Sequence, residues 1–260
     1  MSLVHNMSAM IKVQKLKKSF KSDFYKKSTL SLKEVSFVIP KGHFVGLIGP
    51  NGAGKTTTIK CLLEFIFPDS GEIQFEQNKK FIEFKKIIGY LSERPFFQEF
   101  LTGIEFLKLH WELSSIDVRK QHNITFEDRA KQVLDMVKLS HAQNKKLKDY
   151  SKGMLQRIGI AQSIIAFPEF LILDEPMSGL DPDGRILIKD ILNELKKTNI
   201  TVLMSSHLLE DIDELCDDLI VIHDGECLYN GQLSDFKQNY TSLSDAYRAF
   251  KGQLQVNYNV

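Results

Sequence analysis

The residues best suited to chemistry lie in one glycine-rich stretch, residues 49–56, which reads Gly-Pro-Asn-Gly-Ala-Gly-Lys-Thr. It matches the phosphate-binding loop (P-loop) pattern G-x-x-x-x-G-K-[ST] in full. Its three glycines let backbone N–H groups close around phosphate oxygens, and a helix that begins near Gly54 adds the positive end of its dipole. Lys55 is expected to reach the β- and γ-phosphates, and the Thr56 hydroxyl to hold Mg²⁺. The sequence therefore predicts a nucleoside triphosphate site.

The residues on either side of the loop fit the context that the pattern requires. Residues 43–48 form a short apolar run suited to a buried strand, and residues 57–65 suit a helix. A glycine-rich turn that binds nothing is the alternative, and this strand–loop–helix context argues against it. The residues expected at the nucleotide are Gly49, Pro50, Asn51, Gly52, Ala53, Gly54, Lys55, Thr56 and Thr57.

A second signal lies downstream, where the apolar run 170–173 is followed at once by Asp174 and Glu175. A buried strand would deliver both carboxylates to its carboxyl end, where open α/β sheets bind their ligands. Asp174 is then placed to hold Mg²⁺, directly or through water, and Glu175 to polarise an attacking water as a general base. Acidic residues also end many strands without a catalytic role, but a P-loop in the same chain favours the catalytic interpretation.

Length and composition favour one large α/β domain. The chain has 260 residues, 43% of them hydrophobic, and a formal net charge of +1, so no strong field points to nucleic acid as a partner. Cys61, Cys216 and Cys227 lack metal-ligand spacing and are expected to pack as small apolar groups. We expect no membrane span and no signal peptide, because no apolar run approaches 18 residues and the first ten residues lack an apolar core.

Turn residues and hydrophobic periodicity divide the rest of the chain. Capping boxes that start helices are predicted at 102–105 and 125–128, and the pair 181–182, Asp-Pro, predicts another helix start. The pair 224–225, Asp-Gly, predicts a hairpin turn, and the lysine-rich stretch 15–33 either a hairpin or a solvated loop. Strands are expected at 11–13, 32–39, 72–75, 170–173, 200–205 and 219–223, and helices over about 95–150. The pattern predicts a P-loop α/β core interrupted by a helical insertion.

Four further motifs resemble one family. Residues 150–157, Tyr-Ser-Lys-Gly-Met-Leu-Gln-Arg, resemble the signature sequence of ATP-binding cassette (ABC) proteins, and residues 174–176, Asp-Glu-Pro, resemble the end of the Walker B strand. Residues 178–182, Ser-Gly-Leu-Asp-Pro, resemble the D-loop, and residues 205–207, Ser-Ser-His, the switch histidine. With the P-loop, the five elements follow the family's order between about residues 11 and 231, so the resemblance covers nearly the whole chain.

The resemblance implies two cassettes that pair head to tail. Each ATP would lie between the P-loop of one cassette and the signature helix of the other. Ser151 would cap that helix and, with the Gly153 amide, face the γ-phosphate; an ordinary N-cap is its plainer and compatible role. The signature residues implied to contact the partner's ATP are Ser151, Lys152, Gly153, Met154 and Gln156.

Three single residues receive roles from the same resemblance. His207 would bond the γ-phosphate and sense its loss, and Asp181 would communicate across the pair, with a plain helix cap as the alternative. Phe20 resembles the position where the family stacks an aromatic ring on adenine, although Phe24 and Tyr25 lie close by.

The sequence departs from the family's pattern in two places. Glu93 stands where the family usually has a glutamine; it keeps an oxygen ligand but adds a charge. Lys152 stands where glycine is commoner and Met154 where glutamine is commoner. Because Ser151 and Gly153 are kept, the phosphate contacts are expected to survive. The implied metal ligands are Thr56, Glu93 and Asp174, and the implied catalytic residues are Glu175, His207 and Glu93.

The fold class implied is α/β: a P-loop NTPase core with an antiparallel β subdomain and an inserted α-helical subdomain. The cassette would cover residues 11–231, with the insertion at about 95–150, and residues 232–260 would form a C-terminal helical extension. The function implied is the ATP-hydrolysing subunit of an ABC transporter, similar to bacterial exporters, with ATP and Mg²⁺ as cofactors.

The partners implied are a second ATP-binding subunit, identical or closely homologous, and a separate membrane permease, on whose cytoplasmic face the chain would dock. The helical insertion and the loop around Glu93 would form the docking surface. The alternatives are a soluble ABC ATPase that takes no part in transport and another P-loop NTPase. The former usually carries two cassettes or a long coiled-coil insertion, and the latter has no need of residues 151–154.

Overall fold

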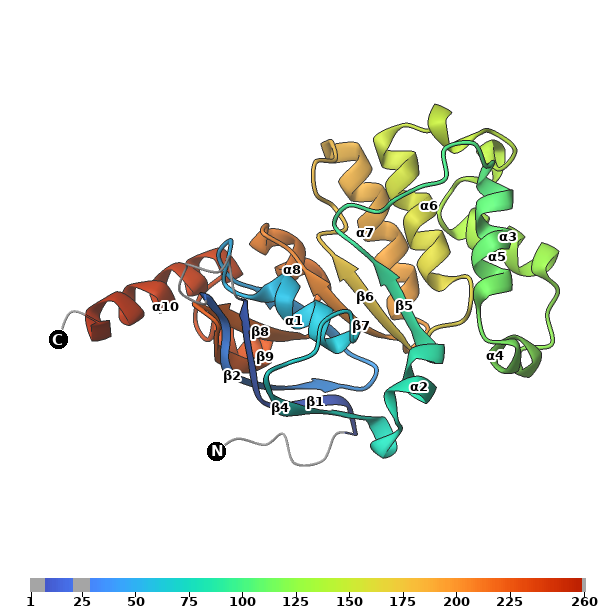
Figure 1. Ribbon diagram of the computed structural model, residues 1–260. Coiled ribbons are helices and arrows are strands. Elements are labelled where there is room, and N and C mark those ends of the chain that lie inside the picture. Colours follow the sequence, from blue (N-terminus) through green and yellow to red (C-terminus); the bar gives the residue numbers. More distant parts are fainter. Residues whose placement is uncertain (1–7, 21–28, 259–260) are drawn as a thin grey trace. The chain divides into compact units, whose positions relative to one another are not determined.

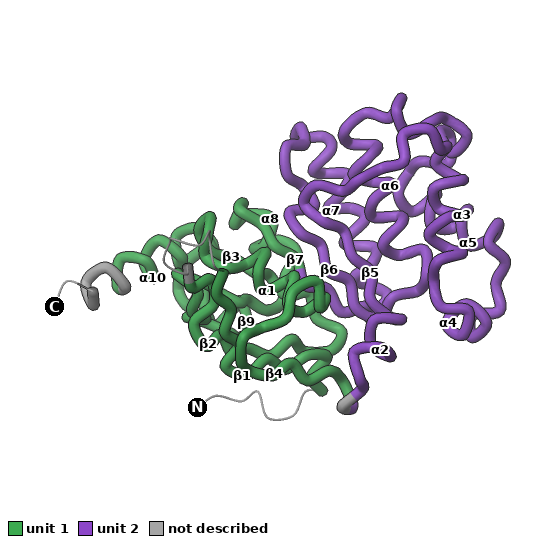
Figure 2. The backbone as a smooth tube through the Cα atoms, in the orientation of Figure 1, with its two compact units in different colours: residues 1–76, 204–260 green, residues 77–203 purple. Residues whose placement is uncertain are grey.

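The computed structural model describes residues 8–20 and 29–258 of the chain (Figure 1). The chain divides into two compact units, which Figure 2 shows in different colours. Unit 1 comprises residues 1–76 and 204–260, and unit 2 comprises residues 77–203. The boundary at 203/204 falls within strand β7 (Thr201–Ser205), all five residues of which are buried.

Unit 1 contains an antiparallel sheet of three strands, β1 (Ala9–Phe20), β2 (Thr29–Pro40) and β4 (Ser70–Phe75), in the order β2-β1-β4. The strands expected at 11–13, 32–39 and 72–75 are therefore present, and all three are longer than expected. Because β1 pairs with β2 up to Phe20 and Thr29, a hairpin is the correct alternative for residues 15–33. Phe24 and Tyr25 lie outside the described residues.

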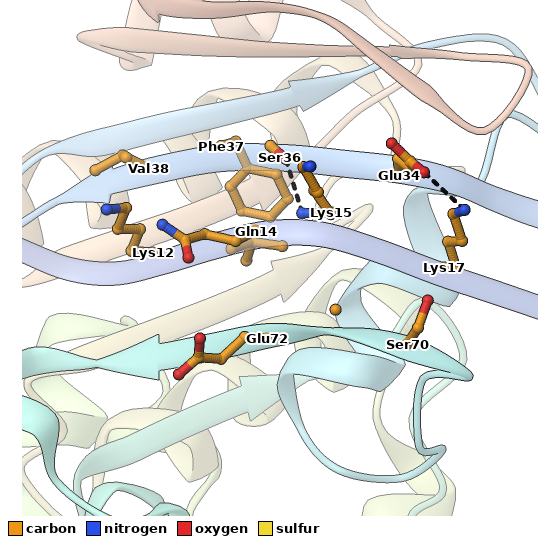
Figure 3. A pocket seen from close by; sticks show the side chains of 12 residues that line it. Lys12, Gln14, Lys15, Lys17, Glu34, Ser36, Phe37, Val38, Ser70 and Glu72 are labelled. Atoms are coloured by element: carbon orange, nitrogen blue, oxygen red, sulfur yellow. Dashed lines mark hydrogen bonds and ion pairs between the residues drawn. The ribbon is translucent and has the colours of Figure 1, made fainter.

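A hollow lined mainly by polar residues lies on this sheet (Figure 3). The pairing of β1 with β2 is irregular around Lys15, which has a φ of 48° and whose amide donates to Ser36 Oγ at 2.8 Å. Lys17 Nζ pairs with Glu34 Oε1 at 2.7 Å. The hollow measures about 840 Å³, and none of the residues expected at the nucleotide lines it.

Unit 1 also contains the strands β3 (Phe44–Ile48), which precedes the P-loop, β8 (Asp218–His223) and β9 (Glu226–Gln232). β3 pairs in parallel with β8, and β8 pairs antiparallel with β9. All five residues of β3 are buried, as an apolar run of this length predicts. Between β8 and β9, Asp224 and Gly225 have φ values of 47° and 76°, which suit a two-residue hairpin turn and confirm the predicted one.

The helices of unit 1 are α1 (Lys55–Leu62), α8 (Leu209–Leu215), α9 (Leu233–Lys237) and α10 (Leu243–Tyr258). Asp213 of α8 anchors the last two: its Oδ1 accepts from Lys237 Nζ at 2.6 Å, and its Oδ2 accepts from the Leu243 amide at 2.9 Å. Helices thus occur where a C-terminal helical extension is expected. The domain boundary at 231/232 stays a prediction.

Unit 2 contains the strands β5 (Ile88–Leu91) and β6 (Phe170–Asp174), which pair in parallel. Its helices are α2 (Phe81–Phe84), α3 (Gly103–Leu113), α4 (Ile116–Gln121), α5 (Phe126–Met136), α6 (Lys152–Ile164) and α7 (Pro182–Lys196). Helices α3, α4 and α5 fall within the stretch 95–150 for which the sequence predicts helices. In the described residues of both units, no helix is both long and apolar enough to cross a membrane.

The predicted helix starts are present. Thr102 and Glu105 form a complete capping box at α3, since each side chain bonds the other residue's backbone amide. Thr125 caps α5 by accepting from the Asp128 amide at 3.1 Å, but the Asp128 carboxylate accepts from the Thr125 hydroxyl instead of its amide. Aspartate is one methylene shorter than glutamate, which accounts for the incomplete box. Asp181 Oδ1 accepts from the Gly184 amide at 2.8 Å and so caps α7.

Candidate nucleotide-binding and hydrolysis site

The P-loop connects the end of β3 to the start of α1 in a conformation that requires glycine. Gly54 is the N-cap of α1 with a φ of 112°, and a Cβ there would lie 2.8 Å from the Ser31 carbonyl oxygen. A Cβ at Gly49 would overlap the Ile222 carbonyl oxygen. Both positions therefore exclude a larger residue, for reasons internal to unit 1.

The P-loop is braced by two segments that lie far from it in the sequence. The Gly225 amide, in the β8–β9 turn, donates to the Ala53 carbonyl at 2.9 Å. The Gly225 carbonyl in turn accepts from the Lys33 amide of β2 at 2.6 Å. Thr57 and Ser31 share a hydroxyl–hydroxyl hydrogen bond of 2.8 Å, which ties the first turn of α1 to β2. Ser31, Lys33 and Gly225 were not among the residues that the sequence predicted for the nucleotide site.

Lys55 lies at the N-terminal end of α1, and its Nζ donates to the Gly49 and Pro50 carbonyls at 2.7 and 3.3 Å. Only 9% of Lys55 is exposed, so its ammonium is held within the loop. The amides of the first helical turn have no intrahelical acceptor and remain suited to an anion. Thr56 is exposed and so accessible to a metal ion, whereas the Thr57 hydroxyl is engaged by Ser31.

Phe20, the residue expected to stack on adenine, lies at the end of β1 and is 44% exposed. Lys18 Nζ lies 5.7 Å from the centroid of its ring. One face of the ring is thus near a cation, and the exposure leaves room for a flat partner. The assignment of Phe20 to adenine stays a prediction.

His207 follows the end of β7 and is exposed. The preceding Ser206 is buried, and its Oγ accepts from the Leu208 amide at 3.0 Å. This bond fixes the backbone on both sides of the histidine. The ring is therefore presented at the carboxyl end of a buried strand, which is where the predicted role in sensing phosphate requires it.

In unit 2, β6 carries the predicted carboxylates to its carboxyl end. All five residues of the strand are buried, including Asp174, which is 3% exposed. Glu175 follows with a φ of 53°, a left-handed conformation that is costly for a residue with a side chain. Strained residues of this kind gather at functional sites, so the backbone supports the catalytic interpretation of Glu175.

Glu93 lies at the same edge of unit 2 as these carboxylates. Leu91 of β5 is paired with Leu173 of β6, so Glu93 leaves the parallel pair where Asp174 does. The pKa of Tyr90 is raised to about 12 by burial and by the negative charges of Asp174 and Glu93. Both carboxylates therefore act on the Tyr90 hydroxyl, a residue that the sequence analysis did not single out.

The signature residues lie at the start of α6. Ser151 Oγ accepts from the Met154 amide at 3.3 Å, so Ser151 is the N-cap. Ser151 and Lys152 are exposed, whereas Gln156 is buried. A Cβ at Gly153 would meet no atom within 4 Å, so nothing in the described chain requires a glycine there.

The structure thus gathers two sets of predicted residues, one in each unit. Unit 1 brings residues 49–57 together with Ser31 and Gly225. Unit 2 brings Glu93 to the carboxyl end of β6, beside Asp174 and Glu175. Among residues 8–20 and 29–258, no three His, Cys, Asp or Glu side chains form a metal-binding group.

The chain is similar to many known proteins. A family model described as ABC transporter matches residues 32–178. An uncharacterized ABC transporter ATP-binding protein of Nostoc sp. is 40% identical over 234 residues, which cover 88% of this chain and 68% of that protein. The bacitracin transport ATP-binding protein BcrA of Bacillus licheniformis is 38% identical over 228 residues, which cover 85% of this chain and 69% of that protein.

Solved structures show the same architecture. An ATP-binding subunit of an ABC transporter matches with a TM-score of 0.78 and 27% identity, covering 93% of this chain and 99% of that one. A dimeric cassette in a post-hydrolysis state, bound to ADP and Pi, matches with a TM-score of 0.71 and 26% identity, covering 86% and 99%. The chain therefore belongs to the ABC transporter family: it is an ATP-binding cassette with ATPase activity, built as a P-loop α/β core with an antiparallel β subdomain and an inserted helical subdomain.

Proposed function

We propose that this cassette hydrolyses MgATP as one half of a head-to-tail pair and thereby drives export through a separate membrane permease. The observation that carries the pairing is the start of α6. Its N-cap Ser151 is exposed, its first turn carries no acidic residue, and Gly153 opens into space that no described atom fills. An exposed helix N-terminus of this composition suits a phosphate presented by another molecule.

Each set of residues then has a task at one nucleotide. Lys55 and the amides of the P-loop hold the phosphates, and Phe20 stacks on the adenine. Glu175 takes a proton from the attacking water, and His207 bonds the γ-phosphate. Asp181, at the start of α7, faces the partner cassette.

The side chains that would hold Mg²⁺ are the Thr56 hydroxyl and the Asp174 and Glu93 carboxylates. All are hard oxygen ligands, which is the donor type that Mg²⁺ prefers. When bound, the ion neutralises charge on the β- and γ-phosphate oxygens.

The permease would dock on unit 2, next to Glu93. Phe96 and Phe100, in the segment between β5 and α3, are 85% and 72% exposed. Exposed large apolar side chains so close together mark a contact surface. The relative BcrA is named for bacitracin transport, which supports a transport role for this chain. Docking on a permease would put the chain at the cytoplasmic face of the membrane.

Glu175→Gln tests the pairing and the catalytic role together. The amide keeps the size of the side chain but cannot take a proton, so the variant should bind ATP, lose at least about a hundredfold in turnover and accumulate a dimer. Size-exclusion chromatography with light scattering, with and without ATP and Mg²⁺, measures the dimer. Unchanged turnover would remove Glu175 from its role, and an ATP-bound monomer would refute the pairing.

Phe96→Ser and Phe100→Ser test the docking surface. The double variant should retain ATPase activity in solution yet fail to copurify in detergent with the permease, which is to be sought among multi-span membrane proteins encoded by neighbouring genes. Phe67→Ser, at a 69% exposed position between α1 and β4 of unit 1, is the matched control. Equal recovery of the membrane protein with all three proteins would show that this segment is not the docking surface.

A further inference from the structure

The signature end of α6 touches the D-loop within the same chain. The Lys152 side chain leaves the first residue of α6 and places its ammonium over Gly179, between β6 and α7. A Cβ built on Gly179 would overlap Lys152 Nζ and would lie 3.2 Å from Lys152 Cε. Gly179 also has a φ of 66°, so both its backbone and its neighbour favour glycine.

The loop under the ammonium is continuous with Glu175. The Ser178 amide donates to the Glu175 carbonyl at 3.1 Å, and the Leu180 amide to the Met177 carbonyl at 3.4 Å. Asp181 then caps α7. Residues 175–181 therefore form a chain of short turns, which a displacement at Gly179 would carry towards the strained backbone of Glu175.

The position of the lysine costs free energy in the isolated cassette. The N-terminal end of a helix carries partial positive charge and disfavours a cation in its first turn. In the described part of the chain, no ion pair or hydrogen bond compensates the Lys152 ammonium. Lys152 is thus poorly explained as a residue that stabilises the fold.

We propose that Lys152 is a positioning residue that couples the two ATP sites of a cassette pair. This proposal rests on the proposed function, in which the start of α6 meets the ATP held by the partner. When that nucleotide engages α6, the Lys152–Gly179 contact transmits the movement to residues 175–181 and so to Glu175, which serves the chain's own ATP. Through this contact, nucleotide binding at one ATP site would change the position of Glu175 at the other.

The test is the cooperativity of ATP hydrolysis by the full chain. Wild-type protein should show a Hill coefficient between 1 and 2, in keeping with two coupled sites. Lys152→Ala should bring the coefficient to 1 and lower kcat on the order of tenfold, with KM changed less than about twofold. Lys152→Arg, which keeps a long cationic side chain, should restore the wild-type coefficient. The melting temperature of Lys152→Ala should not fall, because the substitution removes a positive charge that is unfavourable at a helix N-terminus.

A double-mutant cycle tests whether Gly179 and Lys152 act as one unit. Gly179→Asn supplies a Cβ that displaces the ammonium while tolerating the left-handed backbone. It should reduce cooperativity as Lys152→Ala does, and the double variant should be no worse than either single one.

The outcomes separate this proposal from the proposed function. If Glu175→Gln forms no ATP-dependent dimer, the head-to-tail pair itself fails. If it does pair, a wild-type Hill coefficient of 1, unchanged cooperativity in Lys152→Ala, or additive losses in the double variant would overturn the coupling role alone. A fall in melting temperature that accounts for the lost activity would instead make Lys152 a structural residue.

Discussion

Gly225→Ala should weaken nucleotide binding, although Gly225 lies outside every nucleotide-binding motif of the chain. Gly225 has a φ of 76°, and a Cβ there would lie 2.7 Å from the Ser31 carbonyl oxygen and 3.3 Å from Leu32 Cα. Both contacts are with the backbone of β2, which cannot rotate away as a side chain can. The added methyl group must therefore push the β8–β9 turn and β2 apart.

The cost follows from what that separation breaks. A left-handed backbone conformation costs a residue with a Cβ about 1–2 kcal/mol. Two hydrogen bonds, from the Lys33 amide to Gly225 and from the Gly225 amide to Ala53, contribute about 0.5–1.5 kcal/mol each. The expected loss is about 2–5 kcal/mol in the free energy of unfolding, or at least about 4 °C in melting temperature for a chain of this size.

Calorimetry and nucleotide titration measure the two consequences. Because Ala53 belongs to the P-loop, Gly225→Ala should also weaken ATP binding at least about tenfold. Asp224→Asn is the matched control, since asparagine tolerates the left-handed conformation of the first turn position and leaves Gly225 intact. If Gly225→Ala binds ATP and melts as Asp224→Asn does, the turn does not brace the P-loop and the reasoning is wrong.

Substitutions at three further residues have definite expected outcomes. Lys55→Ala should weaken ATP binding itself while circular dichroism shows an intact fold, because no neutral side chain replaces the ammonium; equal affinity in a titration would contradict the P-loop assignment. Glu93→Gln should remain an active ATPase with modestly weaker Mg²⁺ dependence, whereas Glu93→Ala should lose more activity. ATPase rates measured against Mg²⁺ concentration test this, and a Glu93→Ala variant that matches wild type at every concentration would show that the Glu93 loop is remote from the metal. The pKa of Asp69 is lowered from 3.8 to about 2 by hydrogen bonds from the Ser19 hydroxyl, Lys18 and the Ser19 amide. Because the pKa is lower in the folded state, the ionised Asp69 stabilises the fold above pH 3.8, and this stabilisation is lost as the pH falls towards 2. Asp69→Asn should therefore make the free energy of unfolding less dependent on pH over that range.

The structural elements that sequence predicted correctly are those encoded by neighbouring residues. The P-loop and the strand that ends at Asp174 follow from short patterns, since spacing within a few residues decides them. The caps at Thr102 and Asp181 follow for the same reason, because each bonds an amide three residues away.

The parts that sequence could not supply depend on contacts between distant segments. The hydrogen-bonded residues Ser31 and Thr57 are 26 positions apart in the sequence, and Gly225 and Ala53 are much farther apart. No local pattern therefore marks either pair. The Asp-Gly turn signal did locate Gly225, but only the fold shows which loop it supports. The extent of β1 was missed because its irregular pairing around Lys15 interrupts the alternation from which strands are read.

The left-handed backbone of Glu175 sets function against stability in this cassette. Glycine adopts that conformation without the penalty borne by glutamate, so Glu175→Gly should relieve strain on the order of 1 kcal/mol. A library of variants selected only for heat resistance would therefore enrich proteins that have lost the residue proposed to activate water. Stabilising this ATPase for practical use therefore requires a screen that counts turnover as well as survival, because a substitution that relieves the backbone strain at Glu175 also removes its carboxylate.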